Sequence, residues 1–200
     1  MKFAAIGGLI VFVIVIVIIG VYFGTNKGSD SGVGTIGGSG TGAADTGAAD
    51  TVPSGQFVKI IQDVGVDNDL TGNADDKNKI LNLAELEVFD ESGVNMASGK
   101  TVTGSNEGGF KFVNLVDGNK TNFAHTYGGG DIDFLQVDLG AVKKIKKIVI
   151  TNRADCCQKR AIGIKAVIYG ADGKTVIKET PLITNEAATY TLTFPGAKWT

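Results

Sequence analysis

Short runs in which apolar and polar residues alternate dominate the chain after residue 56. A strand turns successive side chains to opposite faces, so alternation with period two predicts β-strands, and the glycine- and aspartate-rich stretches between the runs predict turns. The sequence therefore predicts one all-β domain over residues 56–200, an antiparallel β-sandwich of about eight strands. The runs cover residues 57–62, 81–89, 134–140, 143–152, 162–170, 174–179 and 188–195.

The start of the chain has a different pattern. After a tail of residues 1–3, residues 4–23 are twenty uncharged positions dominated by Ile and Val. A helix of that length spans about 30 Å, the thickness of a bilayer core, so the pattern predicts a transmembrane helix. The alternative is a cleaved signal peptide, but the small residues of a cleavage site are missing before "GTNKGSD".

Residues 24–55 contain almost nothing that a core would bury. They are rich in Gly, Ser, Ala and Thr and include a tandem "GAADT". Such a composition predicts a flexible linker with an end-to-end distance of roughly 30 Å. The sequence thus predicts a folded domain tethered to a membrane.

Two polar stretches within the domain have structural interpretations. The lysine-rich "KKIKK" at 143–147 is typical of an edge strand or of an outward strand face. Asp67, Asp69 and Gly72 match three positions of an EF-hand loop, but Asn78 stands where the loop needs Glu, so a polar hairpin loop is predicted over 63–79. Only residues 75–83 and 109–116 could form a helical turn.

The overall charge makes nucleic acid an unsuitable partner. The formal net charge of the 200 residues is -2, which gives no attraction to nucleic acid.

The two cysteines are adjacent, Cys156 and Cys157, within "NRADCCQKR". Adjacent Cα atoms are about 3.8 Å apart, so a bond between these residues closes a small strained ring. The residues alone leave open whether they form this bond or remain two free thiols.

The same stretch supplies hydrogen-bond donors suited to a neutral sugar. Arg153 and Arg160 carry planar, permanently charged forks of N–H donors, and His125 is the one histidine of the chain. Glycoside hydrolysis needs a pair of carboxylates in one pocket, whereas Asp155 is alone among arginines. The sequence predicts binding without catalysis, so the protein is not expected to be an enzyme.

"NRADCCQKR" with an upstream "HT" resembles the signature of the F-type, fucose-binding lectins, a branch of the discoidin (galactose-binding-like) β-sandwich domains. The resemblance implies that His125, Arg153 and Arg160 bind the ring oxygen and axial hydroxyls of fucose. It also implies that Cys156 and Cys157 form a disulfide against which the sugar packs, and that Asp155 braces an arginine. Phe123 and Tyr127 are candidates for covering the sugar's methyl group, with core packing as the alternative.

A second resemblance concerns calcium. "NLVDGN" matches the Asn-x-x-Asp-x-Asn run of the family's ion site, and "LAELEV" resembles the strand that supplies its remaining ligands. Oxygen ligands of this kind suit Ca2+. An ordinary Asx turn, or a glycan on the sequon that begins at Asn119, are the alternatives. The resemblance implies a calcium site made of Asn114, Asp117, Asn119, Asn122, the Ala84 carbonyl and Glu85.

Two departures from the family pattern affect the prediction. The strands at 57–61 and 81–89, which close the domain in most relatives, come first here, so the order looks circularly permuted. The spacing from His125 to Arg153 is one residue longer than usual, which predicts a displaced histidine.

The function predicted from the sequence is a single-pass membrane lectin. Its domain would lie on the outer, oxidising side and bind fucosylated glycans, as a homo-oligomer or in a multivalent array on a cell or virion surface. The alternative from another class is a structural or adhesive surface protein that uses the sandwich for protein–protein contacts. A lipid-headgroup binder would need exposed apolar loop tips, which the sequence does not indicate.

Overall fold

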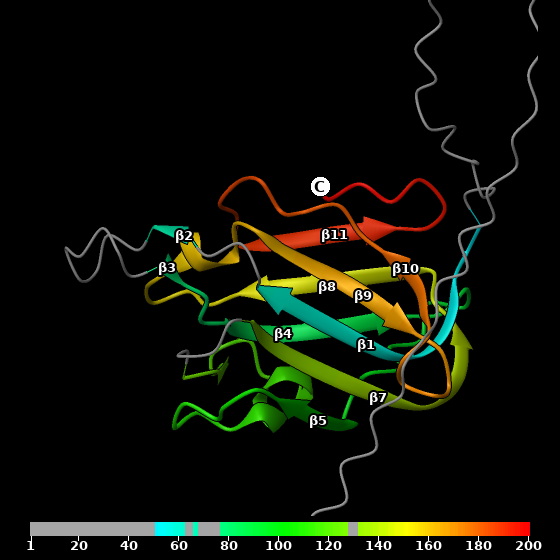
Figure 1. Cartoon of the computed structure of the whole chain (residues 1–200), viewed down its shortest axis with the longest axis horizontal. Helices are drawn as coiled ribbons and strands as arrows, with labels where there is room; N and C mark the ends of the chain where they lie inside the picture. Colours follow the sequence, from blue (N-terminus) through cyan, green and yellow to red (C-terminus); the bar gives the residue numbers. More distant parts are fainter. Residues whose placement is uncertain (1–50, 63–65, 68–76, 128–131) are drawn as a thin grey trace, which may run out of the picture. The chain divides into compact units, whose positions relative to one another are not determined.

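The described part of the chain is a sandwich of two antiparallel sheets (Figure 1). The computed structural model describes residues 51–62, 66–67, 77–127 and 132–200. One sheet has five strands, in the order β10 (Val176–Glu179), β9 (Ile164–Tyr169), β1 (Ser54–Gln62), β7 (Asp133–Lys144) and β5 (Thr101–Gly104). The other has four, in the order β11 (Thr189–Thr193), β8 (Lys147–Asn152), β4 (Asn82–Phe89) and β6 (Ala124–His125).

The predicted all-β antiparallel architecture is confirmed for the described residues, with nine strands in the two main sheets instead of about eight. A separate hairpin pairs β2 (Val66–Asp67) with β3 (Lys77–Asn78), as predicted for the polar loop; the residues between them lie outside the described part. β6 has only two residues and so shows no alternation from which it could be predicted. The short 3-10 helices are η1 (Phe112–Val116), within a stretch compatible with a helical turn, and η2 (Gln158–Ala161).

Alternation accounts for the core between the sheets. In β1 and β8 every second residue is buried, as expected for strands with one covered face. β4 differs, because its first five residues are all buried where η1 packs against it. Fully buried core side chains include Ile60, Leu83, Leu86, Leu115, Leu135, Ile148, Ile150, Ile168 and Phe194.

The lysine-rich run lies at a turn between the sheets. β7 extends to Lys144 and β8 begins at Lys147, so the turn falls at Ile145, whose side chain is buried while its lysine neighbours point outward. β8 pairs with β4 on one side and β11 on the other. The outward face predicted for the lysines is therefore observed, but β8 is not an edge strand.

The domain begins two residues earlier than the predicted boundary at 56. Ser54 and Gly55 pair with Lys144 and Lys143 at the start of β1. A Cβ atom on Gly55 would lie 2.3 Å from Cγ2 of Ile168 and 2.7 Å from the carbonyl oxygen of Tyr169. Gly55 is thus a packing position and not a linker glycine.

The predicted tail, transmembrane helix and most of the linker, residues 1–50, lie outside the described residues. Within the described part no helix is long and apolar enough to cross a membrane.

Strand pairing brings distant residues to one end of the four-stranded sheet. The start of β4 pairs with β6 on one side, Asn82 opposite His125, and with the end of β8 on the other, Leu83 opposite Asn152. His125 and the loop that follows Asn152 are therefore neighbours across β4.

Candidate functional site

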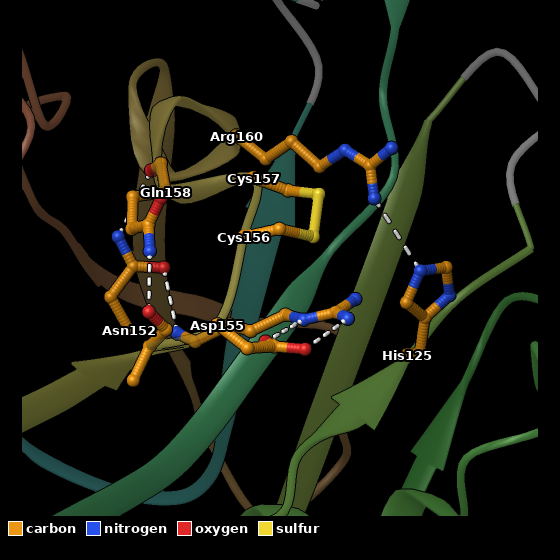
Figure 2. Close-up of a disulfide and its surroundings, with 9 residues drawn as sticks. His125, Asn152, Asp155, Cys156, Cys157, Gln158 and Arg160 are labelled. Carbon is orange, nitrogen blue, oxygen red and sulfur yellow. Dashed lines mark hydrogen bonds and ion pairs between the residues drawn. A yellow bond between two sulfur atoms is a disulfide. The ribbon is translucent and has the colours of Figure 1, made fainter. Parts of the chain in front are cut away.

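Asn152 anchors the loop that carries the cysteines. Its side-chain amide donates to the carbonyl oxygens of Gln158, at 2.9 Å, and Ala187, at 3.1 Å, and its Oδ1 accepts from the Arg153 amide. The side chain is buried. Three hydrogen bonds from one residue close the loop between Asn152 and Gln158 (Figure 2) and tie it to the segment before β11.

Cys156 and Cys157 form a disulfide, so the pairing implied by the family resemblance is observed. Their Cα atoms are 3.8 Å apart, and Cys157 adopts a left-handed backbone conformation with φ of 65°. In Figure 2 the two sulfur atoms lie between Arg160 and Asp155. The bond constrains only the loop itself, since it closes no long segment of chain.

Arg153 is fixed by a carboxylate and by an aromatic ring. Its Nε and Nη2 donate to Asp155, the latter at 2.7 Å, as the resemblance implied. The arginine holds the pKa of Asp155 at about 2, well below its usual range. The guanidinium lies 3.8 Å from the centre of the Phe123 ring, a cation–π contact. Within the described residues the guanidinium hydrogen-bonds only to Asp155, so its remaining N–H groups could donate to a ligand.

Arg160 and His125 form the other side of the site. Arg160 extends from η2, is buried, and its Nη1 lies 3.5 Å from Nε2 of His125 (Figure 2). Because arginine can only donate, Nε2 of the histidine accepts and the imidazole is neutral. Burial, with the charges of Arg160 and Arg153, lowers the pKa of His125. The longer spacing to Arg153 therefore does not carry the histidine away from Arg160.

The aromatic residues divide between packing and exposure. Phe123 is only 8% exposed and packs beneath Arg153, which agrees with the packing alternative, and its contact with a sugar stays a prediction. Phe110 is 46% exposed and stacks on Phe123 with ring centres 4.2 Å apart. Sequence reasoning missed Phe110, because a loop residue fifteen positions before His125 has no periodicity to mark it. Tyr127 is exposed.

The predicted calcium residues gather around the turn after η1. Both carboxylate oxygens of Glu85 accept from the Gly118 amide at 3.2 Å, and Asn122 donates to Asp117 at 2.7 Å. Asn119 accepts from the backbone and hydroxyl of Thr121, and Asp117 accepts from the Asn119 amide, as in the Asx turn alternative. Asn114 instead donates to the carbonyl of Phe123 and so supports the loop that bears Phe123.

The polar atoms around Glu85 fit a cation. Glu85 is buried, and burial raises its pKa to about 7 although the Gly118 amide and Lys120 favour the charged form, so a nearby cation would stabilise the carboxylate. Oδ1 of Asn122 is buried and has no hydrogen-bond partner among the residues that the structure describes. A bulge between Leu83 and Glu85 takes Ala84 out of the ladder with β8. The described residues contain no metal-type cluster of three or more His, Cys, Asp or Glu, so a bound ion would depend on amide and carbonyl oxygens.

Comparison with known proteins points to the same family. Residues 114–200 match the F5/F8 type C family described as "NedA-like, galactose-binding domain". This match supports the predicted resemblance to discoidin (galactose-binding-like) domains over these residues.

Two curated relatives come from Anguilla japonica. Fucolectin-3 is 39% identical over 59 residues, 28% of this chain and 33% of the relative. Fucolectin-6 is 38% identical over 66 residues, 30% of this chain and 35% of the relative. The chain thus spans about a third of the length of the curated relatives it matches. No solved structure matches it.

The described domain brings together the residues predicted for the sugar, namely His125, Arg153, Asp155, the two cysteines and Arg160. The matched segment begins at residue 114, after β1 and β4, so the circular permutation stays a prediction. Asn152 was missed as the loop anchor. An Asn directly before a turn is the signal by which it would be found.

Proposed function

We propose that this domain binds terminal fucose-like sugars without turning them over. The observation that carries the proposal is the arrangement of His125, Arg153 and Arg160 around the Cys156–Cys157 disulfide. A sugar hydroxyl can accept from N–H groups of both arginines, and Nε2 of the neutral histidine can accept from a sugar hydroxyl in place of Arg160. The name fucolectin, carried by both relatives, supports fucose as the sugar.

The apolar part of the sugar would pack on the disulfide and on Phe110. The disulfide offers a surface held by the Asn152 hydrogen bonds, and Phe110 is the exposed ring of the aromatic pair. Affinity at a single site should be weak, since each hydrogen bond to the sugar replaces one to water.

Calcium is proposed as the ion of the Glu85 site. Glu85, Asp117, Asn122 and the Ala84 carbonyl would hold it, with Asn114 and Asn119 turned from their present hydrogen bonds. When bound, the ion would neutralise two carboxylates and join β4 to the turn after η1. The turn leads directly to Phe123, so a rigid turn would also steady Arg153.

The whole chain is proposed to act at a surface. Residues 4–23 would anchor it and the linker would let the domain turn, so that many copies on one membrane bind an array of glycans together. The disulfide requires an oxidising compartment, which supports a domain outside the cell or virion.

A glycan array probed with the full chain tests the function. We expect signals on glycans with terminal fucose, lost in Arg160→Ala and retained in Lys174→Ala, an exposed control on the turn before β10. Circular dichroism of each protein verifies the fold. A folded wild-type protein without any glycan signal would contradict the proposal and favour the protein–protein alternative.

A further inference from the structure

A second cleft lies beside the proposed sugar site. It has a volume of about 570 Å³, within the roughly 300–1,000 Å³ of small-molecule sites. Its walls come from the end of β8, the loop after Asn152 and the segment 186–189. In Figure 2 Asn152 and Gln158, which line it, lie on one side of the disulfide and His125 on the other. Arg153 lines this cleft and, held by Asp155, is also part of the proposed sugar site.

The lining of this cleft combines small apolar surfaces with polar groups that can make further hydrogen bonds. Ala154, Ala187 and Ala188 offer surfaces on which the C–H face of a sugar can pack. Gln158 donates to the Ala154 carbonyl, which leaves its Oε1 to accept from a ligand, and Arg153 supplies N–H donors. A polyhydroxylated ligand meets such a lining with both donors and acceptors.

The charged residues of the cleft favour a neutral ligand over an acidic one. Glu186 is exposed, lines the cleft and has no ion-pair partner among the described residues. The two cations of the lining are already paired, Lys120 with Glu87 at 2.9 Å and Arg153 with Asp155. The cleft therefore presents one uncompensated carboxylate, which accepts from neutral hydroxyls and repels an acidic group.

We propose that this cleft is a subsite for the next residue of a neutral oligosaccharide whose terminal sugar occupies the His125 site, and that Glu186 disfavours acidic, sialylated glycans. The inference rests on the proposed function, because Arg153 joins the two regions.

The test compares the full chain with two tryptophan variants. Ala188→Trp fills the cleft, and Ala171→Trp places the same side chain at an exposed position on the turn after β9. Calorimetry measures binding of L-fucose, 2′-fucosyllactose and 3-fucosyllactose. We expect wild type and Ala171→Trp to bind at least one trisaccharide about 5-fold more tightly than L-fucose, and Ala188→Trp to bind all three ligands alike.

The charge is tested with Glu186→Gln. This variant should gain about 3- to 10-fold in affinity for a sialylated fucosyllactose and remain within 2-fold of wild type for L-fucose. Equal binding of L-fucose and both trisaccharides by the wild type, or equal trisaccharide affinity in the two tryptophan variants, would overturn the subsite alone. Absence of L-fucose binding by the folded wild type would overturn the proposed function and the subsite with it.

Discussion

The guanidinium of Arg153 is positioned on two sides before any ligand arrives. Asp155 takes two of its N–H groups and Phe123 supports its flat face. An arginine held in this way loses little side-chain freedom when it donates to a sugar. In the proposed site, Asp155 would contribute to binding through Arg153 and would need no contact with the ligand.

Asp155→Asn tests this positioning. We expect about a 5-fold loss of affinity for the sugar with little change in melting temperature, because the pair is exposed at the carboxylate and such pairs stabilise weakly. Asp172→Asn is the matched control, since Asp172 accepts from Lys174 and Thr175 in a distant turn. It should lower the melting temperature and leave affinity unchanged. Unchanged affinity in Asp155→Asn would contradict the positioning role.

The protonation of His125 predicts a pH dependence. Burial lowers its pKa from 6.5, with Arg160 and Arg153 acting in the same direction and Asp133 opposing. The folded state then binds fewer protons than the unfolded state, so this contribution to stability is complete above about 6.5 and is lost as pH falls through the lowered pKa.

Sugar binding should follow the same direction, because a protonated imidazole cannot accept from Arg160 and repels both arginines. We expect constant affinity from pH 7 to 8 and a decline on acidification below about 6.5, measured at saturating calcium. His125→Gln, which keeps an acceptor but does not titrate, should show a flat profile. A decline of equal size in this variant would assign the titration to another group.

At the scale of elements, the start of β1 decides where the domain begins. β1 lies between β7 and β9 in the centre of its sheet, so close contacts surround its backbone. Residues 54 and 55 belong compositionally to the linker, yet both pair with the end of β7. Sequence reasoning placed the boundary late, because glycine and serine signal flexibility unless a neighbouring strand excludes a side chain.

Gly55→Ala measures this packing. The new Cβ would meet Ile168 and the backbone of Tyr169 at 2.3 and 2.7 Å, so we expect a loss of about 1–3 kcal/mol in the free energy of unfolding, measured by urea denaturation. Gly170→Ala is the control, since its nearest neighbours are 3.7 Å away. Equal stability of the two variants would show that the β1 end is loosely packed.

At the scale of the whole domain, the site and the Glu85 turn both depend on β4. Its first residues pair with β6 and β8, which carry His125 and Asn152, and its buried Glu85 accepts from the turn after η1. A cation bound at Glu85 would therefore stabilise the same strand that assembles the sugar site.

Calcium should raise the stability of the domain. At 100 times its dissociation constant a ligand adds about 2.7 kcal/mol, and we expect a corresponding rise in melting temperature that a chelator reverses. Glu85→Gln should remove the calcium-dependent rise, whereas Glu87→Gln, which breaks only the surface pair with Lys120, should keep it. A calcium response that survives in Glu85→Gln would place the ion elsewhere.

The sequence by itself determined the fold class and the residues of the loop from Arg153 to Arg160. Alternation is a local property of strands, and the loop's chemistry lies within eight consecutive residues. Only the tertiary structure decided that Phe123 supports Arg153, that Phe110 is the exposed ring, that Asn152 is held by hydrogen bonds and that Gly55 is held by packing. These roles arise between residues far apart in the chain, where strand pairing, and not local pattern, sets the distances.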